Sequence, residues 1–203
     1  MSDLNINIKP KHKWILGVVS AVSVYLIIRF FNKTMKDNLE NTDLNEAGYD
    51  LSPVWDAKSD AIITKLHPSI RNKARAFINE AEKKGMKLKV TSGGRTFEEQ
   101  DKLYAQGRTT SGNIVTNAKA GYSWHNFFLA FDVVPVENGK INWKSKNWTK
   151  IGTLGKTFGL EWGGDWKTFK DLPHFQTIHG LTTAQAREKK KKNQVDNQGY
   201  LLV

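Results

Sequence analysis

Two short segments of this chain each combine a histidine with a carboxylate, and together they constrain the fold more than any other feature. Residues 123–132 have the sequence SWHNFFLAFD, and residues 171–174 have the sequence DLPH. Zinc in proteins takes nitrogen and oxygen ligands, and a hydrolytic site keeps one coordination position open for water. A further carboxylate beside the metal can accept a proton from that water. The candidate ligands are His125, Asp132 and His174, and the candidate base is Asp171.

A shared metal requires the chain to bend between His125 and Asp132. The two residues are seven positions apart, and in a regular strand an odd separation places side chains on opposite faces. We therefore expect a bend at residues 126–128. Asp132 also lies in an apolar segment, where a buried carboxylate needs a cation or several donors. An arginine that pairs with the Asp132 carboxylate is the alternative to a metal ion.

Pro173 strengthens the case for His174, which alone would be an ordinary turn or core histidine. Proline restricts the preceding Leu172 to an extended conformation and makes a rigid short turn. Such a turn can hold Asp171 and His174 on the same side of a cleft. The remaining histidines have no comparable neighbours and are predicted to be structural or solvent-facing: His12, His67 and His179.

Composition limits the other possibilities. The chain has 203 residues, enough for one good-sized core, and contains no cysteine, so thiolate ligands and disulfides are excluded. The net charge is +11. Residues 1–38 contain six Lys/Arg and two Asp, and residues 187–203 contain five Lys/Arg and two acidic residues. A nucleic-acid partner is not expected, because much of the charge lies in the two ends and no nucleic-acid-binding motif is present.

The amino end contains an apolar run at residues 14–28, preceded by lysines and followed by Arg29. A cleaved signal peptide and a buried helix are alternatives, but no small residues suited to signal peptidase follow the run. We predict an uncleaved signal anchor at 14–31, with the amino end in the cytoplasm and the rest outside the membrane. The predicted organisation is a basic flank (1–13), the anchor (14–31), a linker (32–52), one domain (53–180) and a mobile basic tail (181–203).

Periodicity and capping signals predict several elements of the domain. Apolar residues recur at helical spacing over 70–81 and 148–158, and a glycine follows each segment. Thr96 and Glu99 form a capping box that begins another helix. Short strands are expected at 88–91 and 129–134, the second stopped by Pro135, and an irregular loop at 108–122.

Two further segments bear on the site. Arg95 follows Gly93 and Gly94 in a turn between the strand and the capped helix, from which it can project into a cleft. There it could stabilise an oxyanion or bind a substrate carboxylate, although a surface arginine is the ordinary alternative. In the segment WGGDW (162–166), we expect the tryptophans to be structural and leave the role of Asp165 open.

Taken together, these segments resemble the zinc peptidases of the VanX/VanY D-Ala-D-Ala peptidase superfamily, and among them the L-alanyl-D-glutamate peptidases of phage endolysins. The matching motifs are residues 123–132, 92–95 with Glu99 and Gln100, 159–166 and 171–174. The resemblance covers about residues 53–180 and implies an α+β fold, a small antiparallel sheet flanked by helices as in hedgehog and D-Ala-D-Ala peptidase domains.

The resemblance also implies the roles of individual residues. It assigns zinc, the only cofactor expected, to His125, Asp132 and His174. It assigns catalysis to Asp171 and Arg95, and makes Ser123 and Gln100 residues of the substrate cleft. The chain departs from the family pattern twice: Phe128 stands where the family has glycine, and Gly94 stands where an aromatic residue is common.

The function implied is hydrolysis of an amide bond in the peptidoglycan stem peptide, with the L-Ala-D-Glu bond preferred. A D-Ala-D-Ala carboxypeptidase and a non-catalytic zinc-containing wall-binding module are the alternatives. We expect a monomer in the cell envelope, anchored in the membrane through residues 14–31, with its domain on the outer side.

Overall fold

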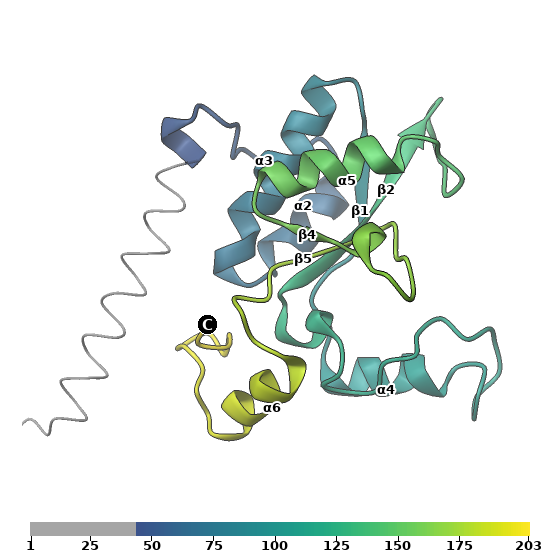
Figure 1. Cartoon of the computed structure of the whole chain (residues 1–203), viewed down its shortest axis with the longest axis vertical. Coiled ribbons are helices and arrows are strands. Elements are labelled where there is room, and N and C mark those ends of the chain that lie inside the picture. Colours follow the sequence, from purple (N-terminus) through teal and green to yellow (C-terminus); the bar gives the residue numbers. More distant parts are fainter. Residues whose placement is uncertain (1–43) are drawn as a thin grey trace, which may run out of the picture. The chain divides into compact units, whose positions relative to one another are not determined.

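The computed structural model describes residues 44–203, in which five short strands form one antiparallel sheet (Figure 1). The strands are β1 (Leu88–Ser92), β2 (Ala130–Glu137), β3 (Lys140–Ile141), β4 (Glu161–Trp162) and β5 (His174–Gln176). Their order is β1-β2-β5-β4, and β3 pairs with the far end of β2. The predicted α+β class with a small antiparallel sheet flanked by helices is confirmed.

The helices are α2 (Ala57–Thr64), α3 (Pro68–Lys83), α4 (Phe97–Ala105), α5 (Trp148–Thr157) and α6 (Thr183–Lys191), with short 3-10 helices η1 (Trp124–Phe127) and η2 (Gly163–Asp165). α3 and α5 match the predicted periodic segments. The capping box of α4 is also present: the Thr96 hydroxyl accepts from the Glu99 amide, and the Glu99 carboxylate accepts from the Thr96 amide.

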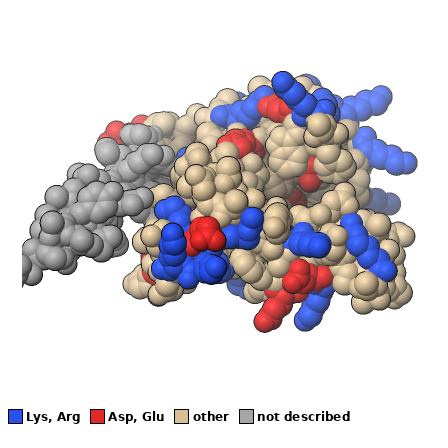
Figure 2. Space-filling view, turned by 60° about the horizontal axis from the view of Figure 1, so that its bottom comes forward, with Lys and Arg blue, Asp and Glu red and all other residues tan. Residues whose placement is uncertain are grey.

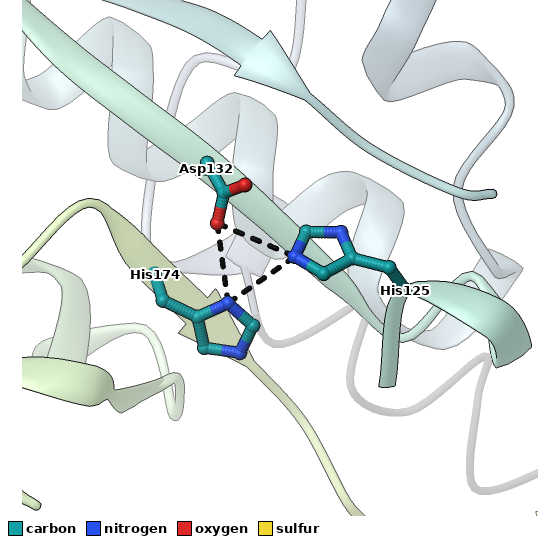
Figure 3. A group of neighbouring side chains, drawn as sticks. All are labelled: His125, Asp132 and His174. Carbon is teal, nitrogen blue, oxygen red and sulfur yellow. Dashed lines mark hydrogen bonds and ion pairs between the residues drawn. The ribbon is translucent and has the colours of Figure 1, made fainter. Parts of the chain in front are cut away.

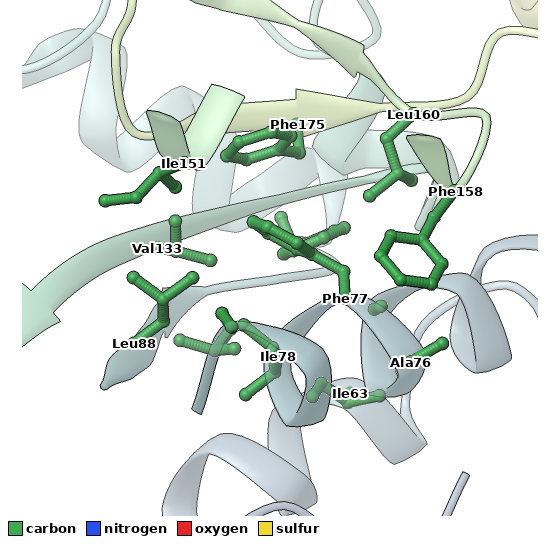
Figure 4. Packing of buried hydrophobic residues seen from close by; sticks show 14 of the residues in the cluster. Ile63, Ala76, Phe77, Ile78, Leu88, Val133, Ile151, Phe158, Leu160 and Phe175 are labelled. Atoms are coloured by element: carbon green, nitrogen blue, oxygen red, sulfur yellow. The ribbon is translucent and has the colours of Figure 1, made fainter. Parts of the chain in front are cut away.

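The main hydrophobic core lies between one face of the sheet and helices α3 and α5 (Figure 4). Phe77 of α3 packs against Phe175 of β5, with ring centroids 4.8 Å apart, and Phe175 stacks with Phe131 of β2. Gly155 of α5 approaches Phe175 so closely that a β-carbon there would overlap the ring. These aromatic contacts fix β2 and β5 side by side.

Because strand residues alternate between faces, the neighbours of the core aromatics lie on the other face of the sheet. Phe131 is paired with Phe175, and Asp132 is paired with His174. Asp132 and His174 are therefore directly opposite each other on the face away from the main core. The apolar alternation that builds the core thus also brings together two candidate ligands.

Pro135 does not end β2, contrary to the prediction. The strand continues to Glu137, and Pro135 is paired with Leu88 of β1. The amide of the next residue, Val136, donates to the Lys87 carbonyl, so the nitrogen of Pro135 faces away from β1. β5 pairs only with residues 130–132 of β2. The missing N–H of proline therefore removes no hydrogen bond from the ladder between β1 and β2.

The segment predicted to be a mobile basic tail (181–203) contains a helix and buried residues. The segment forms α6, which begins with its own capping box, and the chain then returns so that Leu201 is buried. Leu201 and Ala186 form a second hydrophobic cluster with Phe127 and Leu129. The terminal segment is therefore part of the folded unit, because its few apolar residues pack on apolar residues of the domain.

The predicted linker (32–52) also contributes to packing over its described part. Leu44, Tyr49 and Leu51 contact the main core, and the Asn79 side-chain amide donates to the carbonyls of Asp50 and Ser52. The predicted basic flank (1–13) and anchor (14–31) lie outside the described residues. Within residues 44–203, none of the helices combines the length and apolar character needed to cross a bilayer.

The charged side chains on the face drawn in Figure 2 lie in several separate groups, with Asp and Glu between the Lys and Arg side chains. On this face the basic residues do not form one continuous surface.

Candidate metal centre

His125, Asp132 and His174 converge on one point, each from a different element (Figure 3). His125 lies in η1, Asp132 in β2 and His174 in β5. Nε2 of His125 is 3.3 Å from Oδ1 of Asp132 and 3.2 Å from Nδ1 of His174. Nδ1 of His174 is 3.1 Å from the same carboxylate oxygen. The three residues predicted as ligands are therefore brought together.

These separations suit a bound metal ion. Two donors that each lie about 2.0–2.1 Å from a tetrahedrally coordinated ion are separated by about 3.3 Å. The three donor pairs are 3.1–3.3 Å apart, so they form one triangular face of such a tetrahedron. Two nitrogens and one carboxylate oxygen can hold the ion and leave the fourth position for another ligand.

The ring of His125 is oriented by the turn that precedes α4. Its Nδ1 lies 2.7 Å from the carbonyl oxygen of Gly93. A carbonyl only accepts, so Nδ1 bears the proton and donates. Nε2 is left unprotonated in the neutral ring and faces Asp132 and His174, as a metal ligand must.

The ring of His174 is oriented in the same way by a side chain. Nε2 of His174 lies 2.9 Å from Oε1 of Gln176, and Nε2 of Gln176 donates to the Glu161 carboxylate at 2.9 Å. A carboxylate accepts only, which fixes the amide of Gln176 with its oxygen toward His174. Nδ1 of His174 is therefore the nitrogen available to a metal.

The electrostatics of the cluster favour a positive charge at its centre. Burial alone would raise the pKa of Asp132, but the adjacent imidazoles of His125 and His174 hold that pKa well below its ordinary value. Burial alone would lower the pKa of His174, but the Asp132 carboxylate raises it above its ordinary value. A buried carboxylate that attracts a proton to the facing imidazoles will also attract a metal cation.

The bend expected between His125 and Asp132 is present and ends at Phe128. After η1, Phe128 adopts the left-handed conformation, with φ 61° and ψ 20°. A residue other than glycine is destabilised there by about 1 kcal/mol or more, because its β-carbon crowds the backbone. Two residues later β2 begins, and this change of direction lets His125 and Asp132 face the same point.

The two positions at which the chain departs from the family pattern lie in contact. A β-carbon built on Gly94 would overlap the ring of Phe128. Phe128 thus occupies the space into which a side chain at position 94 would extend. The glycine at 94 is required by the phenylalanine at 128.

Asp171 lies half-buried beside the cluster, in the turn that leads into β5. Its amide donates to the Gly163 carbonyl, and its own carbonyl accepts from the His174 amide, so the backbone of the turn is fixed. Burial raises the pKa of the Asp171 carboxyl, and the charge of Asp132 raises it further, while the imidazoles of His174 and His125 lower it. The carboxylate is therefore within electrostatic reach of all three candidate ligands.

Arg95 is half-buried and is held by two side chains. One terminal nitrogen donates to Oε1 of Gln100 and the other to the Ser92 hydroxyl, both at 2.9 Å. The Arg95 amide donates to the His125 carbonyl at 2.9 Å, which ties the arginine turn to η1. Burial lowers the pKa of Arg95, but a guanidinium remains charged in proteins.

Gln100 was predicted to lie in the substrate cleft, but its side chain is fully buried. Its oxygen accepts from Arg95, and its nitrogen donates to the Ala118 carbonyl at 2.7 Å. Complete burial does not permit direct contact with a substrate, so Gln100 instead positions Arg95. Ser123 is half-buried at the start of η1, and its hydroxyl caps no helix amide.

The tryptophans of the WGGDW segment have different environments. Trp162 is buried and donates from its indole nitrogen to the Leu172 carbonyl, as the structural interpretation predicted. Trp166 lies against the ring of His174, with centroids 5.1 Å apart. Asp165, whose role was left open, forms a surface ion pair with Lys156 at 2.7 Å.

Sequence reasoning missed Gln176, Glu161 and Trp166 as neighbours of His174. Gln176 could have been found, since it follows His174 by two positions in a strand and so shares its face. Glu161 becomes a neighbour only through the pairing of β4 with β5. No signal in the sequence indicates that pairing.

The chain is similar to several known peptidases. A family model described as D-alanyl-D-alanine carboxypeptidase matches residues 116–177, a range that includes the candidate ligands and Asp171. The peptidoglycan L-alanyl-D-glutamate endopeptidase CwlK of Bacillus subtilis is 44% identical over 123 residues, covering 56% of this chain and 74% of that protein. The L-alanyl-D-glutamate peptidase of Listeria phage A118 is 28% identical over 124 residues, covering 59% of this chain and 41% of that protein.

Among solved structures, the chain is similar to the L-Ala D-Glu endopeptidase ChiX of Serratia marcescens. The identity is 24%, the TM-score is 0.47, and the match covers 67% of this chain and 96% of that structure.

Proposed function

This chain belongs to the VanX/VanY superfamily of D-Ala-D-Ala peptidases, and we propose that it is a zinc endopeptidase that cuts the L-Ala-D-Glu bond of the peptidoglycan stem peptide. The observation that supports the chemistry best is the triangle of donors formed by His125, Asp132 and His174, with the Asp171 carboxylate beside it. The choice of bond follows the relative that is 44% identical, whose name states that specificity.

The three donors would hold the zinc, which when bound supplies a Lewis acid that polarises the scissile carbonyl and lowers the pKa of water. Asp171 accepts a proton from the attacking water on its carboxylate. It then delivers that proton to the amide nitrogen as the C–N bond breaks, so that the amine leaves uncharged.

Arg95 provides positive charge on the side of the cleft formed by the turn before α4. Two hydrogen bonds, to Gln100 and Ser92, fix the guanidinium, and its remaining N–H groups can contact the developing oxyanion or a neighbouring carboxylate. The stem peptide offers such a carboxylate on its D-Glu residue. Ser123 is retained as a candidate contact with the substrate, because it precedes His125 and is not fully buried.

We also propose that the protein acts in the cell envelope, with residues 14–31 as a membrane anchor and the peptidase domain on the outer side. The support is the apolar run in the sequence and the location of peptidoglycan outside the cytoplasmic membrane. A monomer is sufficient for this activity, since one chain supplies all the donors.

Digestion of purified peptidoglycan by the full-length protein, loaded with zinc in mild detergent, tests the proposal. Mass spectrometry of the products should reveal peptides with a new amino terminus on D-Glu. Release of free D-alanine instead would identify a carboxypeptidase. If the protein binds zinc stoichiometrically but releases no product, the result would contradict the enzymatic proposal and favour a non-catalytic wall-binding module.

A further inference from the structure

The C-terminal segment packs directly on the bend that presents His125. Phe127 and Leu129, on either side of Phe128, belong to the same hydrophobic cluster as Leu201 and Ala186. Between them, the ring of Phe128 meets the ring of Tyr200 edge-on, with centroids 5.8 Å apart and an interplanar angle of 85°. Tyr200 and Leu201, about seventy positions away in the sequence, therefore lie on the bend.

Tyr200 is itself fixed to the body of the domain. Its hydroxyl donates to the Lys65 carbonyl at 3.2 Å, and its ring lies against His67 and near the guanidinium of Arg71. The next residue, Leu201, accepts through its carbonyl from Nε2 of buried His67 at 2.8 Å. The C-terminal segment thus has a defined position at the start of α3.

On its other side, Phe128 touches the turn that orients His125. Its ring fills the space above Gly94. The residues that flank Gly94 both bond to His125: the Gly93 carbonyl accepts from Nδ1, and the Arg95 amide donates to the His125 carbonyl. Displacement of the ring would release the turn, and with it the acceptor that sets the orientation of the imidazole.

We propose that Tyr200 and Phe128 are positioning residues for the metal ligand His125. Tyr200 holds the ring of Phe128 against Gly94, and the Gly93 carbonyl is thereby kept in place to accept from the imidazole. The left-handed conformation of Phe128 directs its ring to this place and is maintained by contacts on both sides. The inference rests on the proposed metal site, but not on which bond the enzyme cuts.

Zinc affinity of the full-length protein, measured by competition with a chromogenic chelator, tests this inference. Tyr200→Ala should weaken zinc binding about tenfold, the lower end of the range for loss of a group that orients a metal ligand. Tyr200→Phe keeps the ring and should bind zinc like the wild type. Tyr49→Ala is the matched control, because Tyr49 makes a similar edge-on contact with Phe158 in the main core. It should lower the melting temperature without changing zinc affinity.

A second pair of variants tests the contact even if Tyr200→Ala fails to fold. Gly94→Ala places a β-carbon in the Phe128 ring and should weaken zinc binding. In a Phe128→Gly background the space is empty, so adding Gly94→Ala should cause no further loss. The inference is overturned if Tyr200→Ala binds zinc as the wild type does, or if Gly94→Ala is equally harmful in both backgrounds.

Peptidoglycan hydrolysis, measured on the same samples, separates this inference from the proposed function. A wild-type protein that binds zinc but cuts no peptide contradicts the peptidase, while the zinc affinities of the variants still decide the role of Tyr200. A wild-type protein that binds no zinc contradicts both.

Discussion

Oε1 of Gln176 lies 2.9 Å from Nε2 of His174, and this contact decides which nitrogen of the ligand faces the metal centre. Because the amide oxygen only accepts, Nε2 must carry the proton, and Nδ1 points toward Asp132. Gln176 is in turn fixed by the carboxylate of Glu161. The pairing of β4 with β5 is thus part of the metal site, although neither Gln176 nor Glu161 touches the metal position.

Gln176→Leu should weaken zinc binding by about 10- to 100-fold, because His174 loses the acceptor that fixes its tautomer and ring orientation. Glu161→Gln is the control, since its amide oxygen can still accept from Gln176, and it should change zinc affinity much less. Chelator competition measures both. Equal affinities for Gln176→Leu and the wild type would show that the strand backbone alone orients His174.

Asp171→Asn should abolish hydrolysis and leave zinc bound. Loss of a positioned general base costs about 10²- to 10⁴-fold in rate, whereas the three donors remain intact. His174→Ala, in contrast, should lose both zinc and activity. Zinc content by elemental analysis, together with product formation from peptidoglycan, distinguishes the two roles. If Asp171→Asn released its zinc, Asp171 would have to be counted among the ligands.

The same Asp171→Asn variant should be at least as stable as the wild type when both are freed of metal at neutral pH. Burial raises the pKa of Asp171 in the folded state above its value in the unfolded chain. The folded protein therefore holds the proton of the Asp171 carboxyl more tightly than the unfolded chain does. The protonated carboxyl favours the folded state at low pH, and this contribution is lost as the pH rises from the pKa of the unfolded chain through that of the folded protein. An uncharged asparagine removes that cost. Thermal unfolding in excess chelator measures the difference, and a clearly less stable variant would contradict it.

Removal of the metal should lower the melting temperature of the wild type. At a free zinc concentration of about one hundred times the dissociation constant, binding adds about 2.7 kcal/mol to the free energy of unfolding. For a domain of this size that corresponds to roughly 5–10 °C. Scanning calorimetry with and without chelator measures the shift. His174→Ala should show no shift, and a shift that persists in this variant would locate the metal elsewhere.

Phe128→Gly should be more stable than Phe128→Ala by about 1 kcal/mol. Both variants lose the ring that packs on Gly94 and Tyr200, but only alanine keeps a β-carbon in the left-handed conformation. Urea unfolding of the two proteins gives the difference. Equal stabilities would mean that the bend relaxes to another conformation once the ring is removed. Because the ring of Phe128 contacts Tyr200 and fills the space above Gly94, we expect Phe128→Gly to bind zinc more weakly than the wild type.

Much of the secondary structure was predictable, because its signals are local. The helix over 68–83 follows from apolar spacing, and the start of α4 follows from Thr96 and Glu99, which bond to each other's amides. Pro135 misled the prediction for β2, since proline ends a strand only where its missing N–H is needed. The pairing of Pro135 with Leu88 turns the proline nitrogen away from β1, and Leu88 is far away in the sequence.

The sequence by itself determined which residues could hold a metal, because only certain side chains supply the donors and the chain has no cysteine. It also determined that a bend must separate His125 from Asp132. The tertiary structure decided which nitrogen of each histidine faces the site, through Gly93 and Gln176. It also decided that Gln100 is buried behind Arg95 and that the C-terminal segment covers Phe128. The physical reason is that donor chemistry belongs to single residues, whereas orientation and burial depend on contacts between segments that meet only when the chain folds.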